Sequence, residues 1–525
     1  MGVASAWRAL LAGGVVAAGC TPAAPAPVGE VLLTVDTDAP VPALASRLRV
    51  DLFDSSGTWF ASRDFGLPDP SDWPASFAVS APDGGGPATV TVRLRAYSDG
   101  QVRDYLGETF QDRPGATAGH AADIIPMPTP PAGATPRLYD GSQDVTPVTE
   151  PLPLVAIDRL LRVTIVPGVV QGGAVVMRGA CFGTMADVAG DATCVDTEAT
   201  RVADADLPLS SPPPAASASL AGTFGASPCT ATPRAGTTAG GTPLHDEEAC
   251  VPGGAFVFGN TTTPGIGVDQ DTSAPARVAV MPPLRMDRYE MTVARYRAVL
   301  RAGYTGPKVL ANDGPIPSSA GSVQVEETTP YCTYSDQPLD RETLPLTCVS
   351  WTTAHGVCQF LGGDLPTEAE WEYVAAQSGR ASKTRFPWND EPPTCSKVVF
   401  GRGVDFVTSA PDPCAAHGLG FGPQPVGSSG DTSEGLGVRD LAGNATEWML
   451  DTAVPLSSRC WMSALLAAPS CQIPGTVSYS QRGGAWLTPY GSPITLLVTT
   501  RARGQSTYSQ FTEDGFRCVR DGSGS

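Results

Sequence analysis

The sequence predicts an α+β protein in two folded parts, with a β-sandwich-like region at the N-terminus and an irregular α+β domain at the C-terminus. Gly 58 and Pro 51 make up about a fifth of the 525 residues, which favours turn-rich structure over a helical bundle. Short alternating segments are confined to the first part of the chain, whereas segments with helical start and stop signals appear only in the last part.

The segment 29–128 has the pattern of short β-strands. Leu48–Phe53 and Thr89–Tyr97 alternate apolar with polar or charged residues, and Gly, Pro, Asp and Ser separate them. We expect a small antiparallel sandwich here. The next segment, 129–206, is also β-rich and either completes this sandwich or forms a small domain of its own. Residues 207–246 are rich in Pro, Ala, Ser, Gly and Thr and predict a linker.

Residues 1–20 have the features of an export signal. The apolar stretch Ala9–Ala18 is too short to cross a bilayer as a helix, and it runs into Gly19 and Cys20. This ending resembles a bacterial lipoprotein signal, so Cys20 is the expected lipidation site; an ordinary signal peptide cut nearby is the alternative. Residues 21–28 would then form a tether. We expect attachment to a membrane through the lipid on Cys20, within the bacterial cell envelope and facing the periplasm or the cell surface.

Charge and cysteine content restrict the partners and the compartment. A net charge of −19 repels phosphate backbones, so nucleic acid is not an expected partner. Thirteen cysteines less Cys20 leave twelve, an even number, and with no CxxC and only four His, disulfides are favoured over a metal site. Near neighbours suggest five couples, with Cys358 and Cys518 left over: Cys181/Cys194, Cys229/Cys250, Cys332/Cys348, Cys395/Cys414 and Cys460/Cys471.

Three helices are predicted within 247–522. Thr292 is a suitable N-cap for the first, and Thr352 or Thr353 for the second. Thr367 and Glu370 form a capping box at the start of the third. Tryptophans near these helices are expected in the core rather than on a binding surface, and His355 is expected on a helix surface or in packing: Trp351, Trp371, Trp448 and Trp486.

A series of short motifs follows the linker, and each is weak alone but specific as an ordered set. In chain order they are Val251–Phe256, Met286–Thr292, Val349–Trp351, Leu365–Tyr373, Phe386–Trp388, Pro425–Ser428, Leu441–Asn444, Glu447–Trp448, Arg482–Trp486 and Gly515–Cys518. This set resembles the formylglycine-generating enzyme (sulfatase-modifying factor) family. The resemblance implies that 247–522 has the irregular α+β fold of that family, related to C-type lectin folds, and that Cys358 pairs with Cys518.

The family's metal chemistry is only partly retained. Family enzymes oxidise a substrate cysteine to formylglycine with copper held by two cysteines, and here Thr488 and Pro493 occupy those positions. Neither residue supplies the thiolate that Cu(I) prefers, so we expect no copper and no catalytic residue of the family type.

The family's calcium-binding segment, in contrast, is intact. The resemblance implies a Ca²⁺ site formed by Ala442, Gly443 and Ala445 with the carboxylate of Glu447. The alternative is a turn whose carbonyl groups are satisfied by the backbone and which Glu447 caps.

These patterns favour a non-catalytic, surface-exposed lipoprotein whose family-like domain binds an unknown protein or glycan ligand, with the β-rich region as a stalk. The alternative is a superfamily enzyme with an altered active site, having sulfatase-modifying or other oxidoreductase-like activity. Such an enzyme would use a retained groove, with these residues as candidates: Trp448, Arg482, Arg501 and Arg503.

Overall fold

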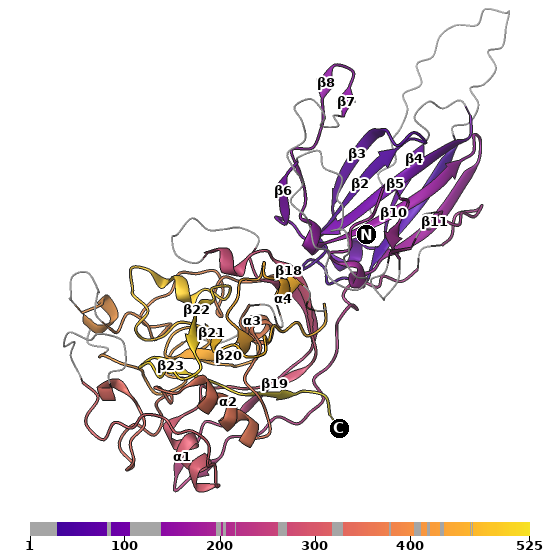
Figure 1. Ribbon diagram of the computed structural model, residues 1–525. Helices are drawn as coiled ribbons and strands as arrows, with labels where there is room; N and C mark the ends of the chain where they lie inside the picture. The colour runs from indigo at the N-terminus through magenta and orange to yellow at the C-terminus, as the bar shows by residue number, and fades with distance from the viewer. Residues whose placement is uncertain are drawn as a thin grey trace, which may run out of the picture.

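The computed structural model of the chain has two domains, an N-terminal β-domain and a C-terminal α+β domain (Figure 1). The structure describes residues 29–524, apart from 81–85, 106–137, 189, 196–200, 203–205, 216, 261–269, 318–328, 377, 379, 404–410, 417–419, 431–434, 463 and 465. The predicted lipoprotein signal with Cys20 and the tether 21–28 lie outside the described residues.

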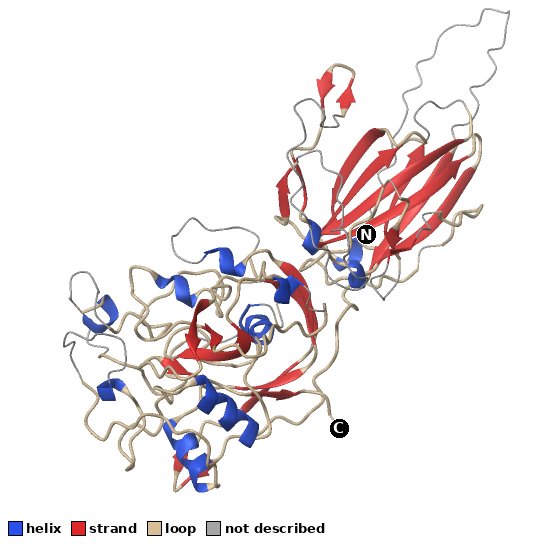
Figure 2. Ribbon diagram, in the orientation of Figure 1, coloured by secondary structure: helices blue, strands red, loops and turns tan. Residues whose placement is uncertain are grey.

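The N-terminal domain is a sandwich of two sheets (Figure 2). One sheet has the strand order β10-β5-β2-β3 and is antiparallel throughout. The other has the order β11-β1-β4, with β1 parallel to β11 and antiparallel to β4. The strands of the sandwich and its short hairpins are β1 (Glu30–Thr37), β2 (Arg47–Phe53), β3 (Trp59–Gly66), β4 (Ala75–Ser80), β5 (Ala88–Tyr97), β6 (Val102–Asp104), β7 (Tyr139–Asp140), β8 (Gln143–Asp144), β9 (Thr149–Pro151), β10 (Ala156–Ile165), β11 (Val170–Met177), β12 (Thr193–Cys194) and β13 (Arg201–Val202).

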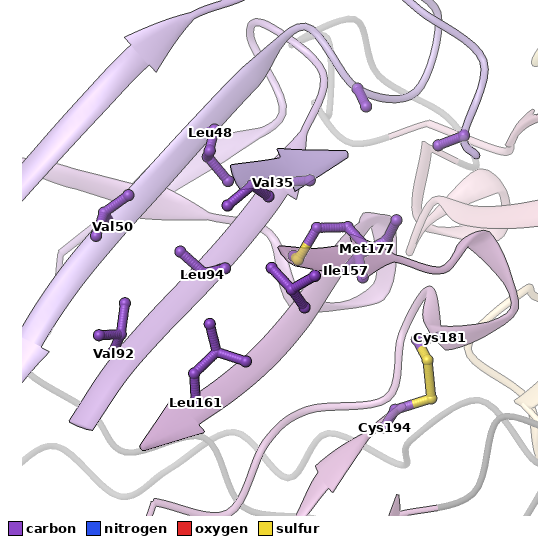
Figure 3. Close-up of a cluster of buried hydrophobic side chains, with 14 of the residues drawn as sticks. Val35, Leu48, Val50, Val92, Leu94, Ile157, Leu161, Met177, Cys181 and Cys194 are labelled. Carbon is purple, nitrogen blue, oxygen red and sulfur yellow. A yellow bond between two sulfur atoms is a disulfide. The ribbon is translucent and has the colours of Figure 1, made fainter. Parts of the chain in front are cut away.

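Apolar side chains from both sheets meet in the interior of the sandwich (Figure 3). Val35 of β1 and Met177 of β11 face Leu48 of β2 and Leu94 of β5, and none of the four is more than slightly exposed. Strands β10 and β11 both come from the segment 129–206. Of the two alternatives for that segment, the structure therefore shows the completion of the first sandwich.

The C-terminal domain is built from short strands, few helices and long loops (Figure 2). Its largest sheet has the order β22-β21-β20-β23, and a second sheet has the order β16-β19-β24. Sheet β17-β18 and hairpin β14-β15 are two-stranded. The strands are β14 (Thr238–Ala239), β15 (Thr242–Pro243), β16 (Glu248–Val251), β17 (Gly254–Phe258), β18 (Arg277–Met281), β19 (Leu284–Asp287), β20 (Thr446–Thr452), β21 (Ser478–Arg482), β22 (Ala502–Ser506), β23 (Asp514–Gly515) and β24 (Val519–Asp521).

The three predicted helices are present, with one corrected start. The helices are α1 (Val293–Arg301), α2 (Trp351–Phe360), α3 (Glu368–Ala376) and the short α4 (Arg459–Met462). The Thr292 hydroxyl accepts the Arg295 N–H and caps α1. Thr367 and Glu370 exchange the two bonds of a capping box at α3, as predicted. The cap of α2 is Ser350, whose hydroxyl accepts the Thr353 N–H, and not a threonine further on.

All twelve cysteines of the described chain are paired, which confirms the prediction of a disulfide-rich protein. The bonds join Cys181–Cys194, Cys229–Cys250, Cys332–Cys348, Cys358–Cys518, Cys395–Cys414 and Cys460–Cys471. So many disulfides are typical of proteins that fold in the periplasm or outside the cell. Within the described residues, no helix combines the length and the apolar character that crossing a membrane requires.

The predicted linker 207–246 packs against both domains. Leu220 N–H donates to the Asp36 carboxylate of the sandwich, and Thr230 N–H donates to the Gly522 carbonyl of the C-terminal domain. In addition, buried residues of the β17-β18 hairpin, such as Val257 and Val278, belong to the same apolar cluster as the sandwich core. The two domains are therefore in direct contact through apolar packing, in addition to being joined by the connecting chain.

Candidate functional site

Of the two positions that the family resemblance assigns to copper, Thr488 lies in a buried turn, and Pro493 is half-buried after the exposed residues 491–492. Thr488 is 6% exposed, and its hydroxyl oxygen accepts the Ala485 N–H at 3.0 Å. The same oxygen lies 2.8 Å from the Thr495 hydroxyl. Pro493 begins a 3-10 helix, η7 (Pro493–Leu496). Because every described cysteine is in a disulfide, the described part of the chain offers no thiolate at this turn.

Apolar side chains fill the space next to this turn. Tyr331 and Trp486 stack with their ring centroids 5.9 Å apart, and Ala485 and Leu487 belong to the same buried cluster. All four side chains are at most 5% exposed. The region that the family resemblance assigns to the metal is therefore packed, and its polar side-chain groups are hydroxyls and the buried indole N–H of Trp486.

Arg482, suggested for a retained groove, lies in the interior in a charge network with α3. Its guanidinium is 2.8 Å from Glu368 and 2.9 Å from Glu372, and no part of its side chain is exposed. Arg501 also donates to Glu368 and is 5% exposed. Burial alone raises the pKa of Glu368, but Arg501 and Arg482 outweigh it and bring that pKa to about 2. These two arginines therefore neutralise buried carboxylates.

The other groove candidates give no support for an open groove. Trp448 is fully buried, and its indole N–H donates to the Val349 carbonyl at 2.8 Å. Arg503 lies in β22, and its side chain is not among the described ones. Trp448 lies in the core, as expected of this tryptophan, and Arg482 and Arg501, which the alternative hypothesis placed in a groove, are buried beside it in the same domain.

The raised pKa of Asp451, which lies beside this network, should make the stability of the domain depend on pH. Burial and then the Glu368 charge raise the pKa of Asp451 to about 7. Because this pKa is higher in the folded than in the unfolded chain, the folded protein binds an extra proton between about pH 4 and pH 7. The free energy of unfolding should therefore fall as pH rises through this window. In Asp451→Asn the fall should be smaller by at least about 1 kcal/mol, measured by urea unfolding at several pH values. An unchanged pH profile in this variant would contradict the assignment.

The residues at the predicted calcium segment do not fit an ion bound through Glu447. Both oxygens of the fully buried Glu447 carboxylate accept from the Arg517 guanidinium, at 2.6 to 2.9 Å. One of them also accepts the Trp371 indole N–H at 3.0 Å. Arg517 thus already supplies the positive charge that a calcium ion would bring to this carboxylate.

The turn itself is held by a second buried carboxyl group. Glu290 accepts the Ala445 N–H at 2.8 Å and the Asn444 side-chain amide at 2.6 Å. Burial, followed by the charges of Asp440 and Glu447, raises the pKa of Glu290 well above its usual value. Glu290 thus anchors the turn through its hydrogen bonds to Asn444 and Ala445.

A different part of the domain does form an open pocket. It has a volume of about 260 Å³ and lies between one face of α2 and the strands β20 and β21. Its lining is mixed aromatic, apolar and polar, and comprises Trp351, His355, Gln359, Asp364, Leu450, Thr452, Gln472, Ile473 and Tyr479. We call this set the α2 pocket.

Three rings of the α2 pocket stack on one another. The Trp351 and Tyr479 ring centroids are 3.7 Å apart with the planes 13° from parallel, and His355 stacks on Trp351 at 4.6 Å. The His355 Nε2 atom lies 3.1 Å from Asp364 and 3.0 Å from the Gln359 amide. Trp351 is therefore half-buried in a pocket wall, whereas the sequence predicted a core residue.

Comparison with protein families agrees with the order of the motifs. The family model described as "Sulfatase-modifying factor enzyme 1-like domain" matches residues 237–522, which is more than half of the chain. The chain belongs to this family. The matched region begins ten residues before the predicted boundary of 247 and so takes in the β14-β15 hairpin.

Curated relatives of this sulfatase-modifying factor domain include enzymes and a protein named as inactive. The formylglycine-generating enzyme of Thermomonospora curvata is 26% identical over 52% of this chain and 92% of its own length. The hercynine oxygenase of Mycolicibacterium thermoresistibile is 25% identical over 41% of this chain and 47% of its own. The mouse "Inactive C-alpha-formylglycine-generating enzyme 2" is 25% identical over 51% of this chain and 84% of its own.

Among solved structures, PvdO from Pseudomonas aeruginosa is 20% identical with a TM-score of 0.40, covering 56% of this chain and all of that one. Family membership does not show whether this sulfatase-modifying factor domain is catalytic. That question depends on which metal-binding side chains the domain itself contains.

Sequence reasoning did not find the α2 pocket. Its residues come from four separate segments between 351 and 479, and only the fold brings them together. One local signal existed, because Trp351 and His355 are spaced i, i+4 on a helix and therefore share a face.

Proposed function

We propose that this protein is an exported lipoprotein in which the sulfatase-modifying factor domain is a non-catalytic, ligand-binding module. The observation that carries the proposal is the donor set at the copper positions. Thr488 is bonded to a neighbouring hydroxyl, Pro493 has no donor, and stacked aromatic rings fill the adjacent space. A soft Cu(I) ion prefers thiolate ligands, and these residues do not provide them.

The location of the module follows from the predicted signal. In this proposal the lipid on Cys20 holds the chain at a membrane, and the packed sandwich carries the C-terminal domain away from it. The disulfides support an oxidising compartment, and the net charge of −19 is unfavourable for nucleic acid. The ligand is a protein or a glycan that the domain meets in the cell envelope.

Copper binding and aldehyde formation test the proposal directly. The purified protein, given Cu(I) and a cysteine-containing peptide of the sulfatase type under oxygen, should form no aldehyde that a hydrazide reagent captures. It should also leave Cu(I) with a competing chromogenic chelator. Aldehyde formation by the unmodified protein would overturn the proposal, because it would show that the protein catalyses the oxidation without cysteines at positions 488 and 493.

A matched variant shows whether these two positions are responsible. In Thr488→Cys/Pro493→Cys, two thiols are placed where the family has them, and this variant should take one equivalent of Cu(I) from the same chelator. The matched control is Thr488→Ser/Pro493→Ala, which should behave like the unmodified protein. Equal copper binding by all three proteins would place the metal elsewhere and contradict the argument from the donor set.

An enzyme with altered chemistry receives less support from the same residues. Arg482 and Arg501, two of the three charged candidates for such a site, each pair with the buried Glu368. A substrate would have to break these pairs to reach either guanidinium, at a high cost in free energy.

A further inference from the structure

The α2 pocket combines features that recognise a small, uncharged, hydroxyl-rich ligand. Its volume of about 260 Å³ lies just below the range of roughly 300–1,000 Å³ typical of sites for drug-sized molecules. A ligand that fits inside is therefore of the size of one six-membered ring with its substituents.

The ring side chains give the pocket a flat apolar wall. Trp351 is fixed by its indole N–H, which donates to the Met449 carbonyl at 2.9 Å, and by its stacking on Tyr479 and His355. Because the rings are held before any ligand arrives, little side-chain entropy is lost on binding. Such a wall is suited to the C–H face of a saccharide ring, which is apolar although the edge of that ring is polar.

Asp364, Gln359 and Gln472 line the pocket with one carboxylate and two amide groups. Each group is planar and carries two polar atoms side by side. The Leu365 N–H reaches Oδ1 of Asp364 at 2.7 Å, and His355 reaches the same oxygen at 3.1 Å. Among the described residues both of these contacts are to Oδ1, so Oδ2 is left for a ligand.

The Gln472 amide donates one N–H to the Ser470 hydroxyl, and the Gln359 amide nitrogen contacts His355. Each amide has a second N–H and a carbonyl oxygen that can serve a ligand. Neighbouring hydroxyl groups of a sugar match such carboxylate and amide pairs.

The charge of the pocket argues against an ionic ligand. Asp364 is its one carboxylate, and it already has the Leu365 N–H and the imidazole of His355 beside it. No lysine or arginine is among the described residues that line the pocket, so no permanent positive charge favours an anion there. An organic cation could use Asp364 and the rings, but it would make no use of the two glutamine amides.

Resting on the proposed ligand-binding role, we propose that the α2 pocket binds one residue of a neutral glycan. The Tyr479 ring, backed by Trp351, forms the apolar wall, and Asp364, Gln359 and Gln472 bind the hydroxyl groups. A single sugar ring has few atoms with which to contribute affinity, so a monosaccharide should bind with a dissociation constant of about 1–10 mM.

The test uses the methyl glycosides of glucose, galactose, mannose and N-acetylglucosamine as probes, with saturation-transfer NMR as the readout and the whole exported chain as the protein. At least one probe should bind. Tyr479→Ala and Asp364→Asn should each weaken this binding at least tenfold, and Tyr479→Phe should retain most of it. The matched control is Tyr508→Ala, since Tyr508 is 78% exposed and outside the pocket, and it should bind as the unmodified protein does.

Each other outcome counts against the proposal. Binding of tetramethylammonium but of no glycoside would make the α2 pocket a cation site. Glycoside binding that survives both Tyr479→Ala and Asp364→Asn would place the saccharide elsewhere on the domain. If none of the probes binds, the glycan assignment is overturned. The non-catalytic role is tested separately, by the copper and aldehyde measurements. Circular dichroism of each variant, unchanged from the parent, shows that lost binding is not lost folding.

Discussion

Replacing Arg482 with methionine is expected to lower the free energy of unfolding of the C-terminal domain by about 3 kcal/mol. The guanidinium is completely buried and donates to Glu368 at 2.8 Å, to Glu372 at 2.9 Å and to the Val498 carbonyl at 2.9 Å. Methionine restores some apolar packing but no charge. Two buried carboxylates then share the charges of Arg501 and Lys383 alone, and one buried carbonyl loses its donor.

The measurement is urea unfolding followed by tryptophan fluorescence, since Trp371 and Trp461 lie beside the network. Lys397→Met is the matched control: Lys397 pairs with Glu391 at the surface of the same domain, and no measurable loss of stability is expected. An Arg482→Met variant as stable as the parent would show that the guanidinium is not buried against these carboxylates.

The first residues of the helices show which features can be predicted from the local sequence alone. The capping box of α3 depends on residues three positions apart, so Thr367 and Glu370 predicted it without knowledge of the fold. The cap of α2 was assigned two or three residues too late, because Ser350, Thr352 and Thr353 are all suitable capping residues. Only the position of Trp351 against β20 and β21 selects the first of them.

Charged residues were harder to place than apolar ones. Alternation of Arg and Asp with Val and Leu in β2 and β5 is typical of a strand with one face in water. In the structure, however, Arg95 and Asp51 form a buried pair at 2.6 Å, and Glu150 of β9 lies 3.6 Å from the same arginine. The segment that covers this face is distant in the sequence, so its effect on the charges was not predictable.

The candidate sites also differ in how far they could be predicted from the sequence. The absence of thiolates at Thr488 and Pro493 was predictable, since it depends only on residue identity. The partner of Glu447 was not, because Arg517 lies 70 residues further along the chain and reaches the carboxylate only in the folded domain. The α2 pocket likewise exists only once β20 and β21 lie beside α2.

Removing the disulfide Cys358–Cys518 with a pair of alanines is expected to have the largest effect on stability, about 5 kcal/mol in the chain-entropy model. The bond spans 160 residues and ties α2 to the last part of the domain, so the unfolded chain gains much freedom when it is absent. The matched variant removes Cys460–Cys471, which spans 11 residues, and should cost about 3 kcal/mol. Urea unfolding of both variants beside the parent, with the free thiols counted, measures the difference. Equal losses in the two variants would show that packing around the sulfur atoms, rather than the length of the closed loop, determines what these bonds contribute.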